Sequence, residues 1–216
     1  MLLVTLGAVD LLGAPLKQDG YQVRPPRTFR MTRMHLFHGT RAGVVTVAGS
    51  SSATRFLSAA LLDGDGEDAA TMAIAVTDAA FALSPSARDE VSTAVLRHFR
   101  DELAMPFVLE GAEVKGTSVP RVQVLGSIRQ GSQLRRVLAA AFPGEARHAV
   151  VLFTVPSGRW DEERPILEAS LDTFRLDAPP PGLSRQWRWA LVVLTSSLLA
   201  LSLGLWRRRR AQGGAE

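Results

Sequence analysis

Hydrophobic and polar residues alternate in two segments near the start of the predicted domain, 21–24 and 28–37. Neighbouring side chains of a strand point to opposite faces, so a hydrophobic residue at every second position predicts a strand with one buried face. Further strands are predicted at 43–48 and at 71–77, the latter after a turn-forming Asp-Gly-Asp-Gly sequence at 63–66. The segment 54–62 fits either a strand or a helix.

Helical spacing replaces the alternation after Ser84. The sequence Ser-Pro-Ser-Ala-Arg-Asp-Glu at 84–90 combines a hydroxyl cap, an early proline and first-turn acids, which favour the start of a helix. Pro106 is expected to follow its end. One face of this helix is expected to carry Val91, Val95, Leu96, Phe99 and Leu103.

The second half of the chain returns to strands and closes with a helix. Strands are predicted near 107–115, 121–128 and 148–154. The segment 133–142 is rich in Leu, Arg and Ala, so it fits either a strand or a helix. A final amphipathic helix is predicted at 161–174, with Glu168 on its outer face. Its inner face is expected to carry Ile166, Leu167, Leu171 and Phe174.

A long apolar segment follows the last predicted helix. No charged residue lies between Trp189 and Trp206, and a helix of that length spans about 27 Å, close to the thickness of a bilayer's hydrocarbon core. Tryptophans favour both membrane interfaces, and arginines favour the cytoplasmic side. The sequence therefore predicts a membrane anchor bounded by Trp187, Trp189, Trp206, Arg207, Arg208, Arg209 and Arg210.

The arginines also predict an orientation and a domain organisation. Four follow the apolar span and two, Arg185 and Arg188, precede it, so the C-terminus is expected in the cytoplasm. We expect a truncated signal or leader at 1–16 and an α+β domain at 17–177. A proline-rich linker is expected at 178–186, a transmembrane helix at 187–206 and a basic tail at 207–216.

Composition argues against several classes of function. The chain has no cysteine, so it has neither a disulfide framework nor a thiolate site. Its formal charge is +4, but residues 17–177 carry 19 basic and 19 acidic side chains. The domain is therefore neutral, and a nucleic-acid partner is not expected. The alanine- and arginine-rich, lysine-poor composition is typical of a high-GC bacterium.

Candidate metal sites are weak. The acidic segment 63–68 has the oxygen density of a calcium loop, but glycine stands at its fourth position where the motif needs one at the sixth. A solvated turn is the simpler interpretation. His35 and His38 are spaced so that they point to opposite faces of a strand, unless a bulge intervenes. We therefore expect no metal and no cofactor.

One catalytic arrangement can be drawn from the sequence. Ser51 lies in a Gly-Ser-Ser-Ser run after a predicted strand, with Asp78 and either His98 or His148 following in the order of a hydrolase triad. A polar turn explains the serine run equally well, and the domain is short for a hydrolase sheet. We expect a protein that is not an enzyme.

Three short motifs resemble the PsbP and DcrB-like superfamily. They are Tyr-Gln-Val-Arg-Pro-Pro at 21–26, Thr-Val-Pro at 154–156 and Ser-x-x-Thr-Phe-Arg at 170–175. The resemblance covers residues 20–177 and implies an antiparallel β-sheet with helices packed on its faces, an α/β/α sandwich. It also implies mostly non-enzymatic roles, such as extrinsic photosystem subunits, periplasmic lipoproteins and cytosolic chaperones. The anchor is a departure from the soluble members.

Together these features predict a single-pass protein of the bacterial inner (cytoplasmic) membrane. It would display a non-catalytic PsbP-like binding or assembly domain on the exocytoplasmic (periplasmic) side, with the lipid bilayer and an unidentified protein as partners. One alternative is a tail-anchored cytosolic DcrB-like chaperone or adaptor for apolar partner segments. Another is a membrane-anchored serine hydrolase.

Overall fold

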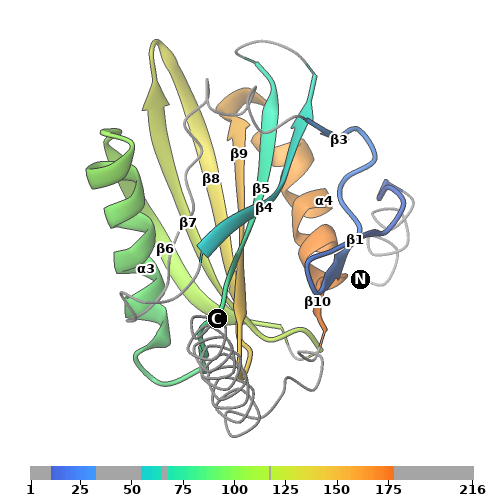
Figure 1. The fold of residues 1–216 in the computed structure, drawn as a ribbon. Helices are drawn as coiled ribbons and strands as arrows, with labels where there is room; N and C mark the ends of the chain where they lie inside the picture. The colour runs from blue at the N-terminus through green and yellow to red at the C-terminus, as the bar shows by residue number, and fades with distance from the viewer. Residues whose placement is uncertain (1–10, 33–54, 65–67, 117, 178–216) are drawn as a thin grey trace, which may run out of the picture. The chain divides into compact units, whose positions relative to one another are not determined.

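Seven antiparallel strands form the main sheet (Figure 1). The computed structural model describes residues 11–32, 55–64, 68–116 and 118–177. Strands β5, β9 and β8 are buried along most of their length, because helices or strands cover both of their faces. In spatial order the strands are β3 (Arg30–Met31), β4 (Arg55–Asp63), β5 (Ala70–Thr77), β9 (His148–Pro156), β8 (Gln133–Phe142), β7 (Arg121–Gln130) and β6 (Phe107–Lys115).

One helix covers the part of the sheet formed by β6 and β7. Helix α3 (Ala87–Arg97) contacts both strands and continues into a single π-helical turn, η2 (His98–Glu102). Val91 and Val95 of α3 are fully buried against the sheet. The ring of Phe99 stacks on that of Phe107 of β6 at a centroid distance of 5.1 Å. This contact fixes the beginning of β6 against the end of the helix.

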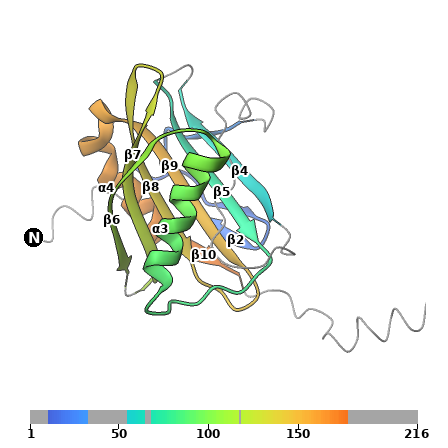
Figure 2. The ribbon, with the colours of Figure 1, turned by 90° about the vertical axis from the view of Figure 1, so that its left-hand side faces the viewer.

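The second helix and a small sheet cover the other face (Figure 2). After β9 the chain forms the short 3₁₀ helix η3 (Ser157–Arg159) and then α4 (Trp160–Asp172). The small sheet has the order β1 (Leu16–Gln18), β2 (Tyr21–Val23) and β10 (Arg175–Leu176). The Phe174 ring stacks on Phe142 of β8 and on Tyr21 of β2, at centroid distances of 4.0 and 5.6 Å. The two sheets are thereby joined through one aromatic side chain.

The sequence pattern locates most of these elements correctly. The predicted strands near 21–24, 71–77, 107–115, 121–128 and 148–154 are confirmed as β2, β5, β6, β7 and β9. Both predicted helices are confirmed as α3 and α4. The two ambiguous segments, 54–62 and 133–142, form strands β4 and β8.

Three details differ from the prediction. Helix α3 begins at Ala87, later than expected, and the preceding Ser86 makes no side-chain capping hydrogen bond. Helix α4 ends at Asp172, so Phe174 lies beyond its last turn and reaches the core from there. The predicted strand at 28–37 is only the two-residue β3 within its described part. Residues 33–37 and the predicted strand at 43–48 lie outside the described residues.

The structure describes part of the predicted leader and none of the predicted anchor. The chain divides into two units, 1–178 and 179–216, and all described residues belong to the first. In the first, Leu12 is buried and forms a bridge with Pro26, and Leu16 opens β1. The described helices include none with the length and apolar character required for a membrane crossing. The predicted span 187–206 lies outside the described residues.

Candidate interaction surface

The predicted anchor residues cannot be placed in this fold. Trp187, Trp189, Trp206, Arg207, Arg208, Arg209 and Arg210 all lie outside the described residues. The same is true of Ser51 and of the histidine pair His35 and His38. The anchor and these chemical candidates therefore stay predictions from sequence.

The described members of the predicted triad bond to other groups. Asp78 forms an ion pair with Arg147 at 3.3 Å. The Nδ1 atom of His148 lies 2.8 Å from the carbonyl oxygen of Ala79, and that of His98 lies 2.8 Å from a Glu102 carboxylate oxygen. Burial lowers the pKa of His148 below its usual value, against a smaller opposing effect of its backbone bond. Neither histidine is thus oriented by Asp78, as a hydrolase triad would require.

The first and last residues of the acidic segment 63–68, Asp63 and Asp68, bond to other side chains, and 65–67 lie outside the described residues. The Arg159 guanidinium pairs with the carboxylates of both Asp63 and Glu163. The carboxylate of Asp68 accepts a hydrogen bond of 2.8 Å from the Gln133 side chain. Burial raises the pKa of Glu163, although its pairing with Arg159 opposes the shift. The described residues contain no cluster of three or more metal-ligating side chains.

A buried serine that the sequence analysis missed joins the small sheet to β4. Ser58 sits at a bulge of β4, and its hydroxyl donates to the carboxylate of Asp19 and lies 3.2 Å from the Tyr21 hydroxyl. Burial raises the pKa of Tyr21 to about 12. No described histidine bonds to the Ser58 hydroxyl, so a base that would activate it as a nucleophile is not seen among the described residues. Its hydrogen bonds fit a structural role, in which Ser58 holds the small sheet against β4.

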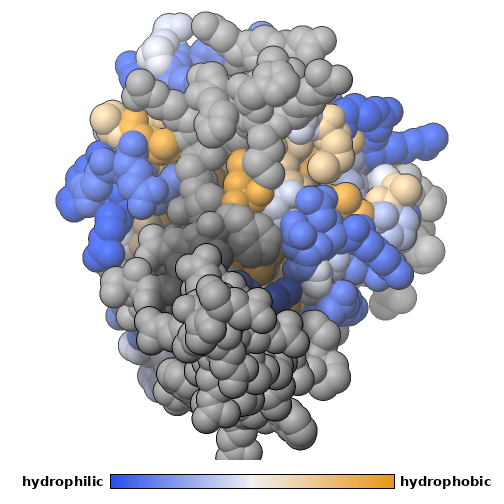
Figure 3. Space-filling model, viewed as in Figure 1, coloured by the Kyte–Doolittle hydropathy of each residue, from blue (hydrophilic) through white to orange (hydrophobic). Residues whose placement is uncertain are grey.

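Exposed apolar side chains concentrate on β6. Hydrophilic residues predominate on both flanks of the surface in Figure 3, with apolar residues in smaller groups between them. Among the described residues, three of the six large exposed hydrophobic side chains lie on the nine-residue strand β6. They are Val108, Leu109 and Val114, with exposed fractions of 60%, 41% and 56%. We call Phe107–Lys115 with these side chains the β6 edge.

The β6 edge is one of the two outermost strands of the main sheet, with β3 at the opposite end. It pairs with β7 on one side only, and no backbone hydrogen bond of the described chain reaches its other side. The register places Leu109 opposite Gly126 and Val114 opposite Val122 of β7. Because Val122 packs in the core beneath α3, Leu109 and Val114 project to the α3 side. Val108 projects to the α4 side.

The position of β6 is fixed by close packing on β7. The Phe107 ring lies over Gly126, where a Cβ atom would come within 2.3 Å of the ring and 2.6 Å of the Val108 carbonyl oxygen. A bulge between Leu109 and Gly111 interrupts the regular pairing. Gly116 then ends the strand with a φ of +88°, a conformation that glycine adopts without strain.

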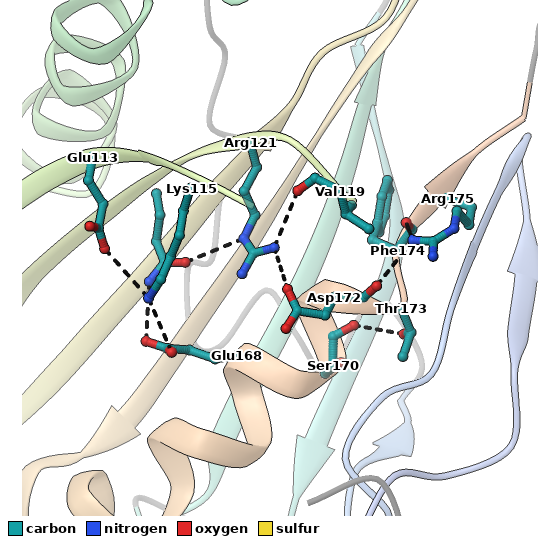
Figure 4. A network of polar contacts seen from close by, with 11 residues as sticks. Glu113, Lys115, Val119, Arg121, Glu168, Ser170, Asp172, Thr173, Phe174 and Arg175 are labelled. Atoms are coloured by element: carbon teal, nitrogen blue, oxygen red, sulfur yellow. Dashed lines mark hydrogen bonds and ion pairs between the residues drawn. The ribbon is translucent and has the colours of Figure 1, made fainter. Parts of the chain in front are cut away.

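A polar network links the end of β6 to α4 (Figure 4). Arg121 of β7 is almost fully buried, and its guanidinium pairs with Asp172 at 2.7 Å. Lys115 of β6 pairs with Glu168 at 3.2 Å and with Glu113 at 3.5 Å. Figure 4 shows these side chains pointing toward one another between the strands and the helix. Removing Asp172 would leave the buried guanidinium of Arg121 without this carboxylate partner, which would destabilise the fold.

The expected outer position of Glu168 is wrong. Its side chain is only 25% exposed and accepts a hydrogen bond of 3.0 Å from Arg164 in addition to its pairing with Lys115. Burial alone would raise the pKa of Glu168, but the bonds from Arg164 and Lys115 outweigh burial and hold the pKa below its usual value. Helical spacing could not reveal this, because the partners come from a strand as well as from the helix.

The comparisons with known proteins support the fold. No protein-family model matches the chain, and no curated protein sequence matches it. Among solved structures, cyanobacterial PsbP (CyanoP) from Synechocystis sp. PCC 6803 is similar with a TM-score of 0.54 and 12% identity. The match covers 76% of this chain and 93% of that one. The described domain therefore has a PsbP-like α+β fold. At 12% sequence identity, the similarity shows a shared fold and not a shared function.

Other matched structures are more distant. LpqN, involved in cell envelope biogenesis of Mycobacterium tuberculosis, matches with a TM-score of 0.40 and 15% identity. That match covers 76% of this chain and 85% of that one. A Pseudomonas aeruginosa protein of unknown function, PA94, matches with a TM-score of 0.38 and 11% identity, over 77% of this chain and 98% of that one. We draw no argument from these two similarities.

Proposed function

We propose that this chain is a single-pass bacterial membrane protein that displays a non-catalytic PsbP-like binding domain on the exocytoplasmic side. The observation that carries the proposal is the sequence of the anchor. An uncharged span from Trp189 to Trp206 is bounded by tryptophans and followed by four arginines. A linker containing three consecutive prolines, Pro179, Pro180 and Pro181, separates it from the domain.

Binding rather than catalysis fits the described domain. The two histidines of the candidate triad are held by Glu102 and by the carbonyl of Ala79. Asp63, at the start of the acidic segment, is paired with Arg159. By contrast, among the described residues nothing pairs with the outer side of β6, and this strand carries exposed apolar side chains. Both features are typical of protein interaction sites.

Alkaline extraction of membranes tests the anchor. Full-length protein should stay in the membrane pellet, because peripheral proteins are released at high pH and spanning helices are not. A variant with Leu194→Arg and Leu198→Arg should move to the soluble fraction, since each arginine near the centre of a span costs about 3 kcal/mol of insertion free energy.

A matched control places the same two charges in the domain, at exposed Met31 and Leu134. This control should remain in the pellet. Release of the unaltered chain, or equal retention of the variant with arginines in the span, would contradict a transmembrane anchor.

A further inference from the structure

We propose that the β6 edge is a strand-addition site for an extended segment of a partner protein. The segment would carry apolar side chains opposite Val108, Leu109 and Val114 and a basic side chain opposite Glu113. This inference rests on the proposed role as a binding domain, and it names the surface and the chemistry of the partner.

The exposed apolar side chains lie on both faces of the strand. Leu109 and Val114 project to the α3 side, and Val108 projects to the α4 side. A helix or a lipid surface docking on one face of the sheet would cover one of these sets. An added strand has side chains on both faces, so it can cover all three at once.

The backbone of β6 supplies the hydrogen-bonding groups of the proposed site. Along Phe107–Lys115, no described segment bonds to the side of β6 that faces away from β7. An extended partner would bond to these N–H and C=O groups as an additional strand, as in other cases of β-strand addition. The strand underneath is held firmly, because Phe107 is packed between Phe99 and Gly126. A preformed, fixed edge lowers the ordering cost of binding.

Charge at the β6 edge selects a basic partner. The side chain of Glu113 is 52% exposed, and its 3.5 Å contact with Lys115 is longer than the 3.2 Å contact between Lys115 and Glu168. Glu168 holds Lys115 on the helix side at 3.2 Å. Glu113 is therefore the carboxylate on this strand that is most available to a cation on an added strand. Glu110, by comparison, pairs with Arg136 of β8.

The same features disfavour a second copy of this chain as the occupant. Antiparallel self-pairing that places Glu113 opposite itself brings two carboxylates together, which is destabilising. Antiparallel self-pairing that places Glu113 opposite Lys115 has its symmetry centre at Val114. Because β6 ends at Lys115, only a few residues of each copy could pair in this arrangement. The bulge at Leu109 to Gly111 also breaks the regular register that a longer symmetric pairing needs.

A peptide-binding experiment tests the proposal. Full-length protein in detergent micelles is titrated with a fluorescent, end-capped peptide Thr-Val-Lys-Thr-Thr-Val-Val-Thr. We expect saturable binding that protects the amides of 107–115 from hydrogen exchange. Methylating alternate backbone nitrogens of the peptide should abolish binding, since it removes the donors that pair with β6. Replacing its lysine by glutamate should weaken binding about fivefold.

Variants of the protein locate the site. Val114→Lys should weaken binding of the lysine peptide about fivefold, and Glu113→Gln should remove the preference for lysine over glutamate. Leu134→Lys is the matched control, because Leu134 is similarly exposed but lies on β8, inside the sheet. It should leave the affinity unchanged.

The proposal is wrong if the peptide shows no saturable binding, or if methylation of the peptide backbone leaves binding intact. It is also wrong if neither Val114→Lys nor Leu134→Lys changes the affinity. A dimer that Val114→Lys dissolves would also overturn it, by assigning the edge to a second copy. These outcomes are independent of the membrane experiments. Failure of strand addition in a chain that stays in the membrane pellet would leave the proposed function standing.

Discussion

Phe174 shows how a single residue can join two parts of this domain. It follows the end of α4, where the chain turns into β10, and it is almost fully buried. Its ring stacks on Phe142 of the main sheet and on Tyr21 of the small sheet. Truncating this side chain removes contacts to both sheets at once, so its effect on stability should be large.

Phe174→Ala should lower the free energy of unfolding by about 3–5 kcal/mol, the range for deleting a buried phenylalanine side chain. Chemical denaturation of the full-length protein in detergent, followed by near-ultraviolet circular dichroism, measures this change. Glu162→Ala is the control, because Glu162 is exposed on α4 and should cost at most about 1 kcal/mol. Similar small losses for the two variants would show that Phe174 is not part of the core.

His148 makes the stability of the domain sensitive to acid. Its side chain is fully buried, and burial lowers its pKa in the folded state below the usual 6.5. The unfolded chain therefore binds the proton more readily, and the free energy of unfolding should fall as the pH drops below about 6.5. The fall should continue until the pH passes the folded-state pKa.

The pH dependence of unfolding, measured between pH 7.5 and 5.0, tests this expectation. His148→Leu should flatten the dependence in this range, whatever its effect on absolute stability. Glu163 contributes with the opposite sign, because its raised pKa favours proton uptake by the folded state. The comparison of His148→Leu with the unaltered chain cancels that contribution. An unchanged slope in the variant would contradict the role of His148.

At the scale of elements, two glycines of the β6–β7 pair should differ sharply in their tolerance of a methyl group. A Cβ atom at Gly126 would lie within 2.3 Å of the Phe107 ring and 2.6 Å of a backbone oxygen. One at Gly111 would have no neighbour within 4 Å. Gly126→Ala should therefore destabilise the protein by about 1–3 kcal/mol through overpacking.

Gly111→Ala is the matched control and should be neutral, or stabilising by up to about 1 kcal/mol. Hydrogen exchange along 107–115 gives a second measurement, because displacement of β6 would expose its amides. Equal effects of the two substitutions, in stability and in exchange, would show that β6 does not lie closely over Gly126.

The sequence located most elements because their patterns are local. Alternation predicts the segment that forms β2, and spacing of three and four residues predicts α3. Strand β8 was ambiguous because helix propensity and burial conflict there. Ala139, Ala140 and Ala141 favour a helix, but β8 lies between β7 and β9 and is buried on both faces, so tertiary pairing overrides propensity.

The candidate site was harder to predict, because it depends on the order of strands in space. The segment 107–115 was correctly predicted as a strand, but nothing local shows that it lies at the edge of the sheet. A sequence signal for an edge strand is the run Val108, Leu109 and Glu110. It places apolar residues on opposite faces of the strand next to a charged residue, and charged residues are common on edge strands. Likewise, the pairing of Arg121 with Asp172 joins residues 51 positions apart.

At the scale of the whole molecule, a PsbP-like domain precedes the apolar segment that the sequence predicts to be a membrane anchor. The PsbP-like fold explains how a domain without cysteine builds a hydrophobic core on both faces of one sheet. The proposed anchor would keep this domain at a membrane surface, connected to it through the proline-rich segment 178–186. Whether the domain works outside the cytoplasm then depends on the arginines that flank the span.

The most direct measurement of the central claim is protease treatment of intact spheroplasts that express the chain with an epitope tag after Glu216. We expect the domain to be digested while a short tagged fragment is protected. Replacing Arg207, Arg208, Arg209 and Arg210 by glutamine should weaken this orientation, and replacing Arg185 and Arg188 should not. A domain that resists protease in intact spheroplasts and is digested after lysis would contradict exocytoplasmic display.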